Sequence, residues 1–130
     1  MRSWPELAIV LALAACGTDS VPREAIEEED ENEMVEVDPD VCETSYLDYD
    51  NFGAPFVINW CRGCHSSAVP ANMRQKAPAD ANFDDLEDIR MWGERIGLRA
   101  AGTSPNMPPA GGPTREERAL LAEWIQCGMR

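Results

Sequence analysis

Residues 61 to 65 read Cys61-Arg62-Gly63-Cys64-His65, and the rest of the chain can be interpreted from this stretch. Two cysteines separated by two residues, with a histidine directly after the second, form the pattern through which haem is attached covalently to a protein. Residues three apart on a helical turn share a face, so both thiols can form thioethers with one porphyrin edge. The neutral imidazole of His65 can then bind the iron. The motif therefore predicts one haem c, covalently bound through Cys61 and Cys64.

The main alternative is a thiol redox site or a zinc site that happens to precede a histidine. A zinc site needs two further ligands at finger-like spacing. The sequence contains one histidine and no second pair of cysteines with this spacing. Haem is therefore the preferred interpretation.

The N-terminal residues are typical of an export signal. Arg2 precedes a short apolar run from Leu7 to Ala15, which is too short to span a bilayer as a permanent helix. Leu13-Ala14-Ala15-Cys16 resembles the cleavage site of a bacterial lipoprotein signal. This resemblance implies that residues 1–15 are removed, that Cys16 carries lipid, and that the protein is anchored in the bacterial cell envelope, with the outer membrane favoured. Ordinary secretion with a free Cys16 thiol is the alternative.

Residues 16–41 are strongly acidic. From Asp19 to Asp40 there are 11 acidic residues and one arginine, a balance of −10 out of the net charge of −13. Such a segment buries too little apolar area to offset its ordering entropy. We expect a disordered tether that holds the folded part away from the membrane.

Residues 42–130 are expected to form one small all-α domain. A first helix is predicted from near Pro55 to Cys61, and a second from about Phe83 to Arg95, capped by Asn82 or Asp84 and stopped by Gly97. Its apolar stripe consists of Leu86, Ile89, Trp92 and Ile96. The third helix follows a capping box formed by Thr114 and Glu117, and it buries Leu120, Leu121, Trp124 and Ile125. No convincing alternating strand pattern is present.

The charge pattern excludes one class of partner and restricts another. No basic stripe is present, so nucleic acid is not expected as a partner. Lys76 is the single lysine. A docking face built from a ring of lysines is therefore excluded.

These features together resemble the class I (monohaem) cytochromes c, of the small lipoprotein type found in bacterial envelopes. The resemblance covers essentially all of the expected folded part. It implies a fold in which the first and last helices cross, with a glycine allowing close approach to an aromatic residue. The matching residues are Gly53, Val57, Cys61, Cys64, His65, Met107-Pro108-Pro109, Leu121 and Trp124.

The second axial ligand of the iron is predicted to be Met107. Because the chain has one histidine, a thioether is the obvious candidate, and Met107 lies in a loop rich in glycine and proline whose few backbone states hold the sulfur in position. Met73 lies too close to His65 to reach the opposite haem face easily, and Met91 is interpreted as a core residue of the second helix. Lys76 as ligand, or an open site, remains as an alternative.

Histidine and methionine together fill both axial positions and leave no vacancy for oxygen or peroxide. The resemblance thus implies a monomeric electron carrier, not an enzyme, that serves redox protein partners in the cell envelope. A peroxidase-like enzyme or a gas sensor, with an open sixth position, is the alternative.

Several supporting roles follow from the resemblance. The carbonyl of Pro70 or Pro78 could accept a hydrogen bond from Nδ1 of His65, as a proline carbonyl does in class I relatives. Trp92, Arg74 and Arg99 could contact the haem propionates. Packing for Trp92 and a solvated position for either arginine are the alternatives.

Cys42 and Cys127 remain after lipid and haem are assigned. A leftover pair in an oxidising compartment suggests a disulfide. If the first and last segments pack together, as the resemblance implies, the two thiols could meet. Two free thiols are the alternative.

Overall fold

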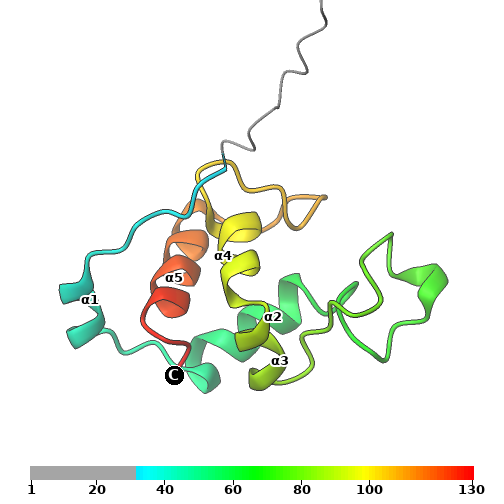
Figure 1. Cartoon of the computed structure of the whole chain (residues 1–130), viewed down its shortest axis with the longest axis horizontal. Coiled ribbons are helices and arrows are strands. Elements are labelled where there is room, and N and C mark those ends of the chain that lie inside the picture. The colour runs from blue at the N-terminus through cyan, green and yellow to red at the C-terminus, as the bar shows by residue number, and fades with distance from the viewer. Residues whose placement is uncertain (1–31) are drawn as a thin grey trace, which may run out of the picture.

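The computed structural model describes residues 32–130, which form a helical fold without any β-strand (Figure 1). This confirms the all-α expectation. A π-helical segment, Tyr49–Gly53, precedes the second α-helix, and a short 3₁₀ turn covers Ala71–Met73. The five α-helices of the described residues are α1 (Pro39–Thr44), α2 (Ala54–Trp60), α3 (Leu86–Met91), α4 (Gly93–Ala101) and α5 (Arg115–Gln126).

The π-helical segment leads into α2, which carries the cysteine motif at its end. Phe56 and Val57 of α2 are buried in the core. Gly53 is buried against α5, since a Cβ atom on it would lie 2.3 Å from the ring of Trp124. The expected close approach between a glycine and an aromatic residue of the last helix is therefore present.

Helix α5 begins as the sequence predicts. The Thr114 hydroxyl accepts a hydrogen bond from the Glu117 backbone N–H at 3.1 Å, and the Glu117 carboxylate accepts one from the Thr114 backbone N–H at 2.7 Å. These bonds satisfy N–H groups that the first helical turn cannot pair itself. Leu121 and Trp124 are among the most deeply buried side chains and form the centre of the core.

The predicted second helix is in fact two helices. Asp85, not Asn82 or Asp84, caps α3, accepting a hydrogen bond from the backbone N–H of Asp88 at 2.9 Å. The backbone leaves helical geometry at Trp92, and α4 then runs on to Ala101. The expected apolar stripe nevertheless points inward, with Ile89 and Ile96 buried.

Gly97 does not stop this helix, contrary to the prediction, but lies inside α4. A Cβ atom on it would lie 2.5 Å from the sulfur of Met34. The glycine therefore makes room for a methionine from the chain segment that precedes α1. Local sequence rules favoured a helix stop because they do not include this long-range contact.

Residues 32–38 of that segment were expected to belong to the tether, which was predicted to end at residue 41. They instead contact the folded domain. Asn32 is buried and donates from its side chain to the Leu98 carbonyl at 2.7 Å. Gln126 of α5 donates to the Val35 carbonyl at 2.6 Å and accepts from the Val37 N–H at 3.0 Å. The domain thus begins before residue 42. The predicted signal peptide, the lipid-modified Cys16 and the tether as far as residue 31 lie outside the described residues.

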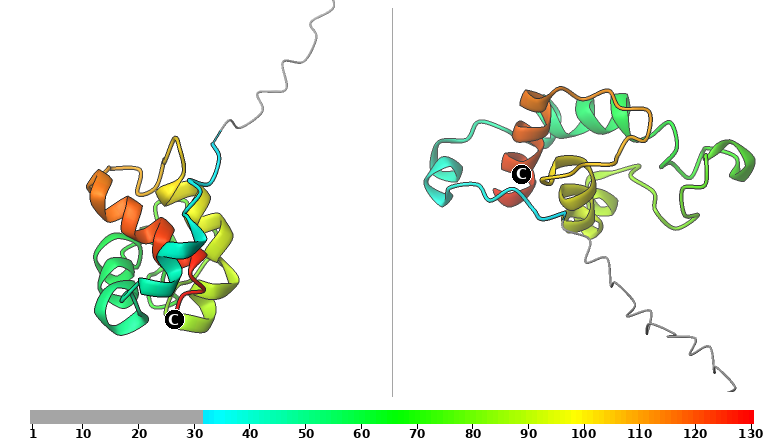
Figure 2. Two further views of the ribbon diagram at one scale, coloured as in Figure 1. Left: turned by 90° about the vertical axis from the view of Figure 1, so that its left-hand side faces the viewer. Right: turned by 90° about the horizontal axis from the view of Figure 1, so that it is seen from above.

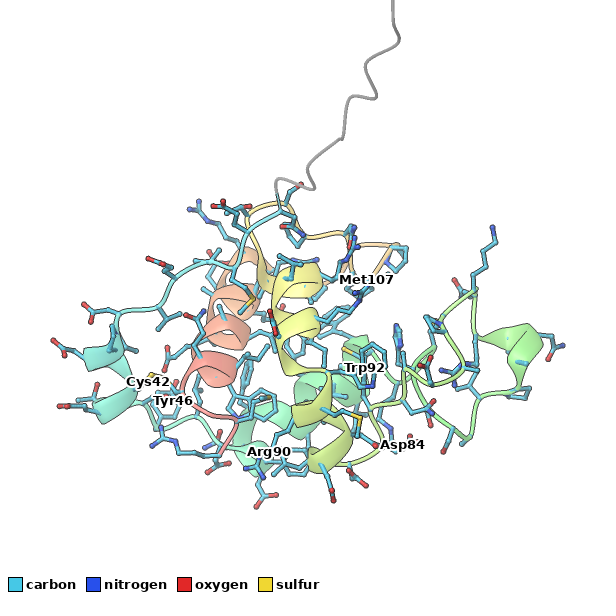
Figure 3. The ribbon with its side chains drawn as sticks, viewed as in Figure 1. Cys42, Tyr46, Asp84, Arg90, Trp92 and Met107 are labelled. Carbon is cyan, nitrogen blue, oxygen red and sulfur yellow. A yellow bond between two sulfur atoms is a disulfide. The ribbon has the colours of Figure 1, made fainter. Side chains whose placement is uncertain are left out.

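A disulfide joins Cys42 of α1 to Cys127 at the end of α5, as the sequence suggested. The Cα atoms of the two residues lie 5.1 Å apart. This bridge and α1 lie at one end of the molecule, while the loop between α2 and α3 projects from the other (Figures 1 and 2). Cys42 and Tyr46 are correspondingly far from Trp92 and Met107 (Figure 3).

Candidate functional site

The cysteine motif continues the last turn of α2 into a tight bend. The Cys61 N–H donates to the Val57 carbonyl at 2.9 Å, while the N–H groups of Cys64 and His65 both donate to the Cys61 carbonyl, at 3.1 and 2.9 Å. This bend brings both thiols and the imidazole to one wall of a pocket. Burial raises the pKa of the Cys61 thiol to about 12, so that thiol is protonated at neutral pH.

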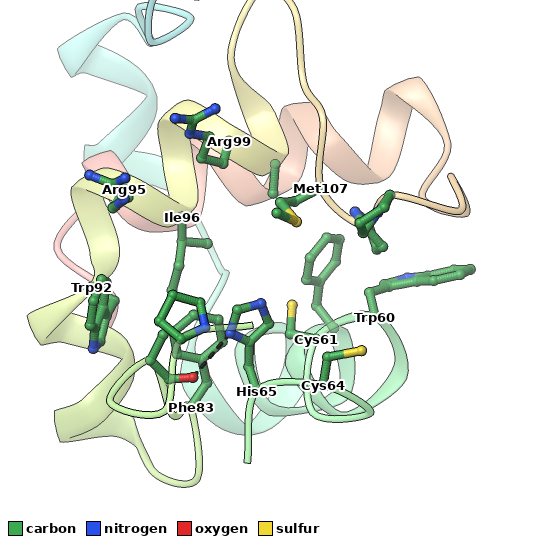
Figure 4. Close-up of a pocket in the computed structure, with 16 residues that line it drawn as sticks. Trp60, Cys61, Cys64, His65, Phe83, Trp92, Arg95, Ile96, Arg99 and Met107 are labelled. Atoms are coloured by element: carbon green, nitrogen blue, oxygen red, sulfur yellow. Dashed lines mark hydrogen bonds between the residues drawn. The ribbon is translucent and has the colours of Figure 1, made fainter. Parts of the chain in front are cut away.

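The pocket has a volume of about 330 Å³ and lies between α2, α4 and the loop that carries Met107 (Figure 4). Cys61, Cys64 and His65 reach it from the side of α2, and Met107 reaches it from the opposite side. Apolar side chains supply most of the remaining wall. They are Phe56, Trp60, Pro78, Ala81, Phe83, Trp92, Ile96, Ala100, Pro108 and Pro109.

His65 is held in one orientation. Its Nδ1 lies 3.0 Å from the carbonyl oxygen of Ala81. Because a carbonyl only accepts, Nδ1 is the donor in this bond, and in a neutral imidazole Nε2 is then the nitrogen that can bind a metal. Phe83 stacks on the imidazole with the ring centroids 4.6 Å apart, and its N–H donates to the His65 carbonyl at 2.9 Å.

The carbonyl of Ala81 replaces both candidates suggested by the resemblance. Pro70 lies in the outer part of the loop and its carbonyl accepts from Met73, while the Pro78 carbonyl accepts from Arg74. The path of the loop between α2 and α3 determines which carbonyl reaches the histidine. Nothing in the side chain of Ala81 signals this role in the sequence.

Arg74 differs from both of its expected positions. It neither lines the pocket nor lies in solvent, since it is only 5% exposed. Its guanidinium instead donates hydrogen bonds to oxygens of the surrounding loop. The arginine therefore organises the segment that carries Ala81.

Asp84 holds the cysteine motif from outside the pocket, a role that the sequence did not reveal. Its carboxylate accepts from the Ser67 N–H at 2.8 Å and pairs with Arg62 at 3.4 Å. Hydrogen bonds from the side chains of Ser66 and Ser67 and from the Ser67 backbone hold the pKa of Asp84 well below its usual range, with a smaller contribution from the charge of Arg62.

Met107 is fixed through its backbone. Its N–H and that of Asn106 both donate to the Arg99 carbonyl at 2.9 Å, and its own carbonyl accepts from Arg118 at 2.8 Å. The peptide bond between Met107 and Pro108 is cis. These contacts hold the loop against α4 and α5.

The rival methionines lie elsewhere. Met73 is 61% exposed and Met91 is 75% exposed, compared with 37% for Met107, and neither rival lines the pocket. The interpretation of Met91 as a core residue was therefore wrong. Lys76 is also exposed and is not part of the pocket wall.

Helix α4 adds two cations to the pocket wall. Arg99 was a candidate from the sequence, whereas Arg95 was missed. Arg95, Ile96 and Arg99 lie three, four and seven residues after Trp92, which places all four on one helical face. That spacing was the signal that could have identified Arg95.

Comparisons of the sequence with protein-family models and with curated proteins, and of the structure with solved structures, return no significant match. Among residues 32–130, no helix is long and apolar enough to cross a membrane. In the same part of the chain, no group of three or more His, Cys, Asp and Glu side chains could hold a metal ion.

Proposed function

We propose that this protein is a monohaem c-type cytochrome that carries single electrons between redox partners in the bacterial cell envelope. The observation that carries this proposal is the set of side chains that line one pocket. Two thiols, an imidazole and a thioether, all singled out from the sequence, line the same apolar pocket.

The residues present fit a covalently bound haem c. Cys61 and Cys64 lie on the wall that also presents His65, so thioether bonds and one axial ligand would come from the same side. Met107 from the opposite side would supply the second axial ligand. Arg95 and Arg99 also line the pocket and would hold the haem propionates through charge-assisted hydrogen bonds.

When bound, the haem supplies a one-electron iron couple. The protein residues would restrict this couple to electron transfer, by excluding oxygen, peroxide and water from the iron. His65 and Met107 would both bind the iron, and a haem held by both would have no ligand position left for oxygen or peroxide. Ala81 and Phe83 fix the imidazole plane, and the apolar wall limits access of water to the centre.

Attachment to the envelope is part of the same proposal. Cys16 would carry the lipid and residues 16–31 would form an acidic tether. The disulfide between Cys42 and Cys127 supports an exported protein, because such bonds persist in oxidising compartments. Radiolabelled palmitate should enter the native chain and not a Cys16→Ser variant, and equal labelling of both would contradict the lipid anchor.

An absorption spectrum tests the proposed function. The chain, produced together with a c-type haem maturation system, should show a low-spin spectrum and a weak far-red sulfur-to-iron band when oxidised. Met107→Ala should abolish that band, and Met91→Ala should leave it unchanged because Met91 is exposed outside the pocket.

Other spectra contradict the proposal in distinct ways. A high-spin spectrum would favour the alternative of a peroxidase-like enzyme or gas sensor with an open sixth position. A protein without a Soret band would exclude both haem functions. Persistence of the sulfur band in Met107→Ala would move the ligand to another methionine.

A further inference from the structure

Arg74 is a buried cation that the proposed function does not use. Its side chain donates four hydrogen bonds, all to uncharged oxygens of the same loop. Buried arginines are usually paired with carboxylates, and a charge held only by dipoles is costly to bury. The acceptors are the carbonyls of Ser66 (2.6 Å), Pro78 (2.6 Å) and Ala81 (3.0 Å) and the side-chain oxygen of Asn82 (2.8 Å).

One of these acceptors connects Arg74 directly to the pocket. The Ala81 carbonyl accepts from Nη2 of Arg74 at 3.0 Å and also from Nδ1 of His65 at 3.0 Å. A carbonyl oxygen has two lone pairs, so it can serve both donors at once. The guanidinium is therefore separated from the imidazole of His65 by a single oxygen atom.

We propose that Arg74 is a positioning residue that raises the reduction potential of the centre bound by His65. This inference rests on the proposed function. It adds a determinant of the potential that does not itself line the pocket and reaches the pocket only through the carbonyls of two lining residues, Pro78 and Ala81.

Two effects of the guanidinium act in the same direction. A fixed positive charge that shares the Ala81 carbonyl with His65 would disfavour the ferric state of a bound iron, which carries one more positive charge than the ferrous state. The guanidinium also draws electron density from the Ala81 carbonyl, which makes that oxygen a weaker acceptor for His65. The imidazole then donates less electron density to the iron, and this too disfavours the ferric state.

A purely structural role for Arg74 predicts something different. If the arginine only braced the loop, replacing it would lower stability without a defined change in potential. Charge and bracing can be separated, because Arg74→Lys keeps the charge but loses the fork of donors, whereas Arg74→Gln loses the charge.

The test is a spectroelectrochemical titration of the haem-loaded protein and three variants. In Arg74→Gln, the ferric-to-ferrous ratio at a fixed solution potential should rise about tenfold, which corresponds to a lowering of the potential by about 59 mV. Arg74→Lys should lower the potential by less than half as much as Arg74→Gln does. The control is Arg90→Gln, because Arg90 also donates to a backbone carbonyl, that of Met129, but is exposed and outside the pocket. Its ratio should change less than about twofold.

The outcomes separate this inference from the proposed function. A low-spin spectrum together with equal potentials for Arg74→Gln and the native protein would overturn the role of Arg74 alone. An equal lowering of the reduction potential in Arg74→Gln and Arg74→Lys would show that Arg74 acts only by bracing the loop, and would also overturn the proposed role of its charge. Absence of a Soret band in the native protein would overturn the proposed function.

A measurement on the native protein keeps the inference testable if Arg74→Gln fails to fold. In the reduced, diamagnetic protein, the Nη protons of Arg74 and the Nδ1 proton of His65 should exchange with solvent far more slowly than those of exposed Arg90. Rapid exchange of the Arg74 protons would show that the shared carbonyl is not held in solution, and would contradict the proposal.

Discussion

Asp84 anchors the cysteine motif through one carboxylate, and its low pKa makes that anchor dependent on pH. A carboxylate whose folded pKa lies below its unfolded value of 3.8 stabilises the fold above that pH, and this stabilisation is lost progressively as the pH falls below it. Asp84→Ala should therefore have a lower urea midpoint than the native protein at pH 6. The difference between the two midpoints should be smaller at pH 2.5.

Asp80→Ala is the matched control, since Asp80 is an exposed carboxylate of the same loop. Its midpoint should follow that of the native protein at both pH values. A constant difference between Asp84→Ala and the native protein across this pH range would contradict an electrostatic anchor.

Arg118 is expected to control how firmly Met107 holds its position. It donates to the carbonyls of Ala100 and Met107 from α5. Loss of these charge-assisted bonds in Arg118→Ala should destabilise the observed position of the Met107 loop by about 1.4 kcal/mol. In the haem-loaded protein, added imidazole should then displace the methionine with about tenfold higher affinity.

The exposed Arg115 of the same helix supplies the control. Arg115→Ala should leave the affinity for imidazole unchanged in an optical titration. An unchanged affinity in Arg118→Ala would show that the Met107 loop is held by other contacts.

At the residue scale, the sequence was most informative where chemistry depends on residue type and spacing. Cys61, Cys64 and His65 were singled out by one short motif, and Met107 by elimination and by its loop, and all four line the same pocket. The Ala81 carbonyl and the buried position of Arg74 could not be predicted, because both depend on the path of an irregular loop. A backbone carbonyl exists at every position and leaves no trace in composition.

At the scale of the helices, the contact between the segment before α2 and helix α5 is set by one glycine. Gly53 has ordinary helical geometry, so only space limits what can replace it, and Trp124 fills that space. Gly53→Ala should reduce the free energy of unfolding by about 2 kcal/mol through overpacking against a rigid ring.

Gly63→Ala provides a matched control, since a Cβ atom at Gly63 would have no neighbour within 4 Å. Chemical denaturation followed by circular dichroism should place its midpoint close to that of the native protein. Equal midpoints for the two variants would show that the contact with Trp124 does not decide the cost of a side chain at residue 53.

Helices were predicted best where their signals are local. The capping box of Thr114 and Glu117 is complete within four residues, and α5 begins where it indicates. The break at Trp92 and the continuation through Gly97 depend instead on partners from elsewhere in the chain. Gly93 and Gly97 accommodate Met129 and Met34, and these contacts override the rules for single helices.

At the scale of the whole molecule, the disulfide joins the two ends of the domain across a separation of 85 residues. Cross-linking a loop of this length restricts the unfolded chain and stabilises the fold by roughly 4 kcal/mol in the chain-entropy model. The double variant Cys42→Ser, Cys127→Ser should lose about this amount in guanidinium denaturation.

Reduction by dithiothreitol should lower the midpoint of the native protein and have no effect on the double variant. A midpoint of the double variant equal to that of the oxidised native protein would show that contacts of residues 32–38 already hold the two ends together. Those contacts were missed because the acidic composition of residues 16–41 predicted disorder, whereas Met34 and Asn32 find partners only in the folded domain.

Covalent attachment of haem to Cys61 and Cys64 can be measured by mass spectrometry of the purified chain, produced with a c-type haem maturation system, then reduced, alkylated and digested. The peptide or linked peptides containing Cys61 and Cys64 should carry the mass of one haem and no alkyl group, while Cys42 and Cys127 should both be alkylated. Alkylation of Cys61 and Cys64 in a chain without haem would contradict this attachment.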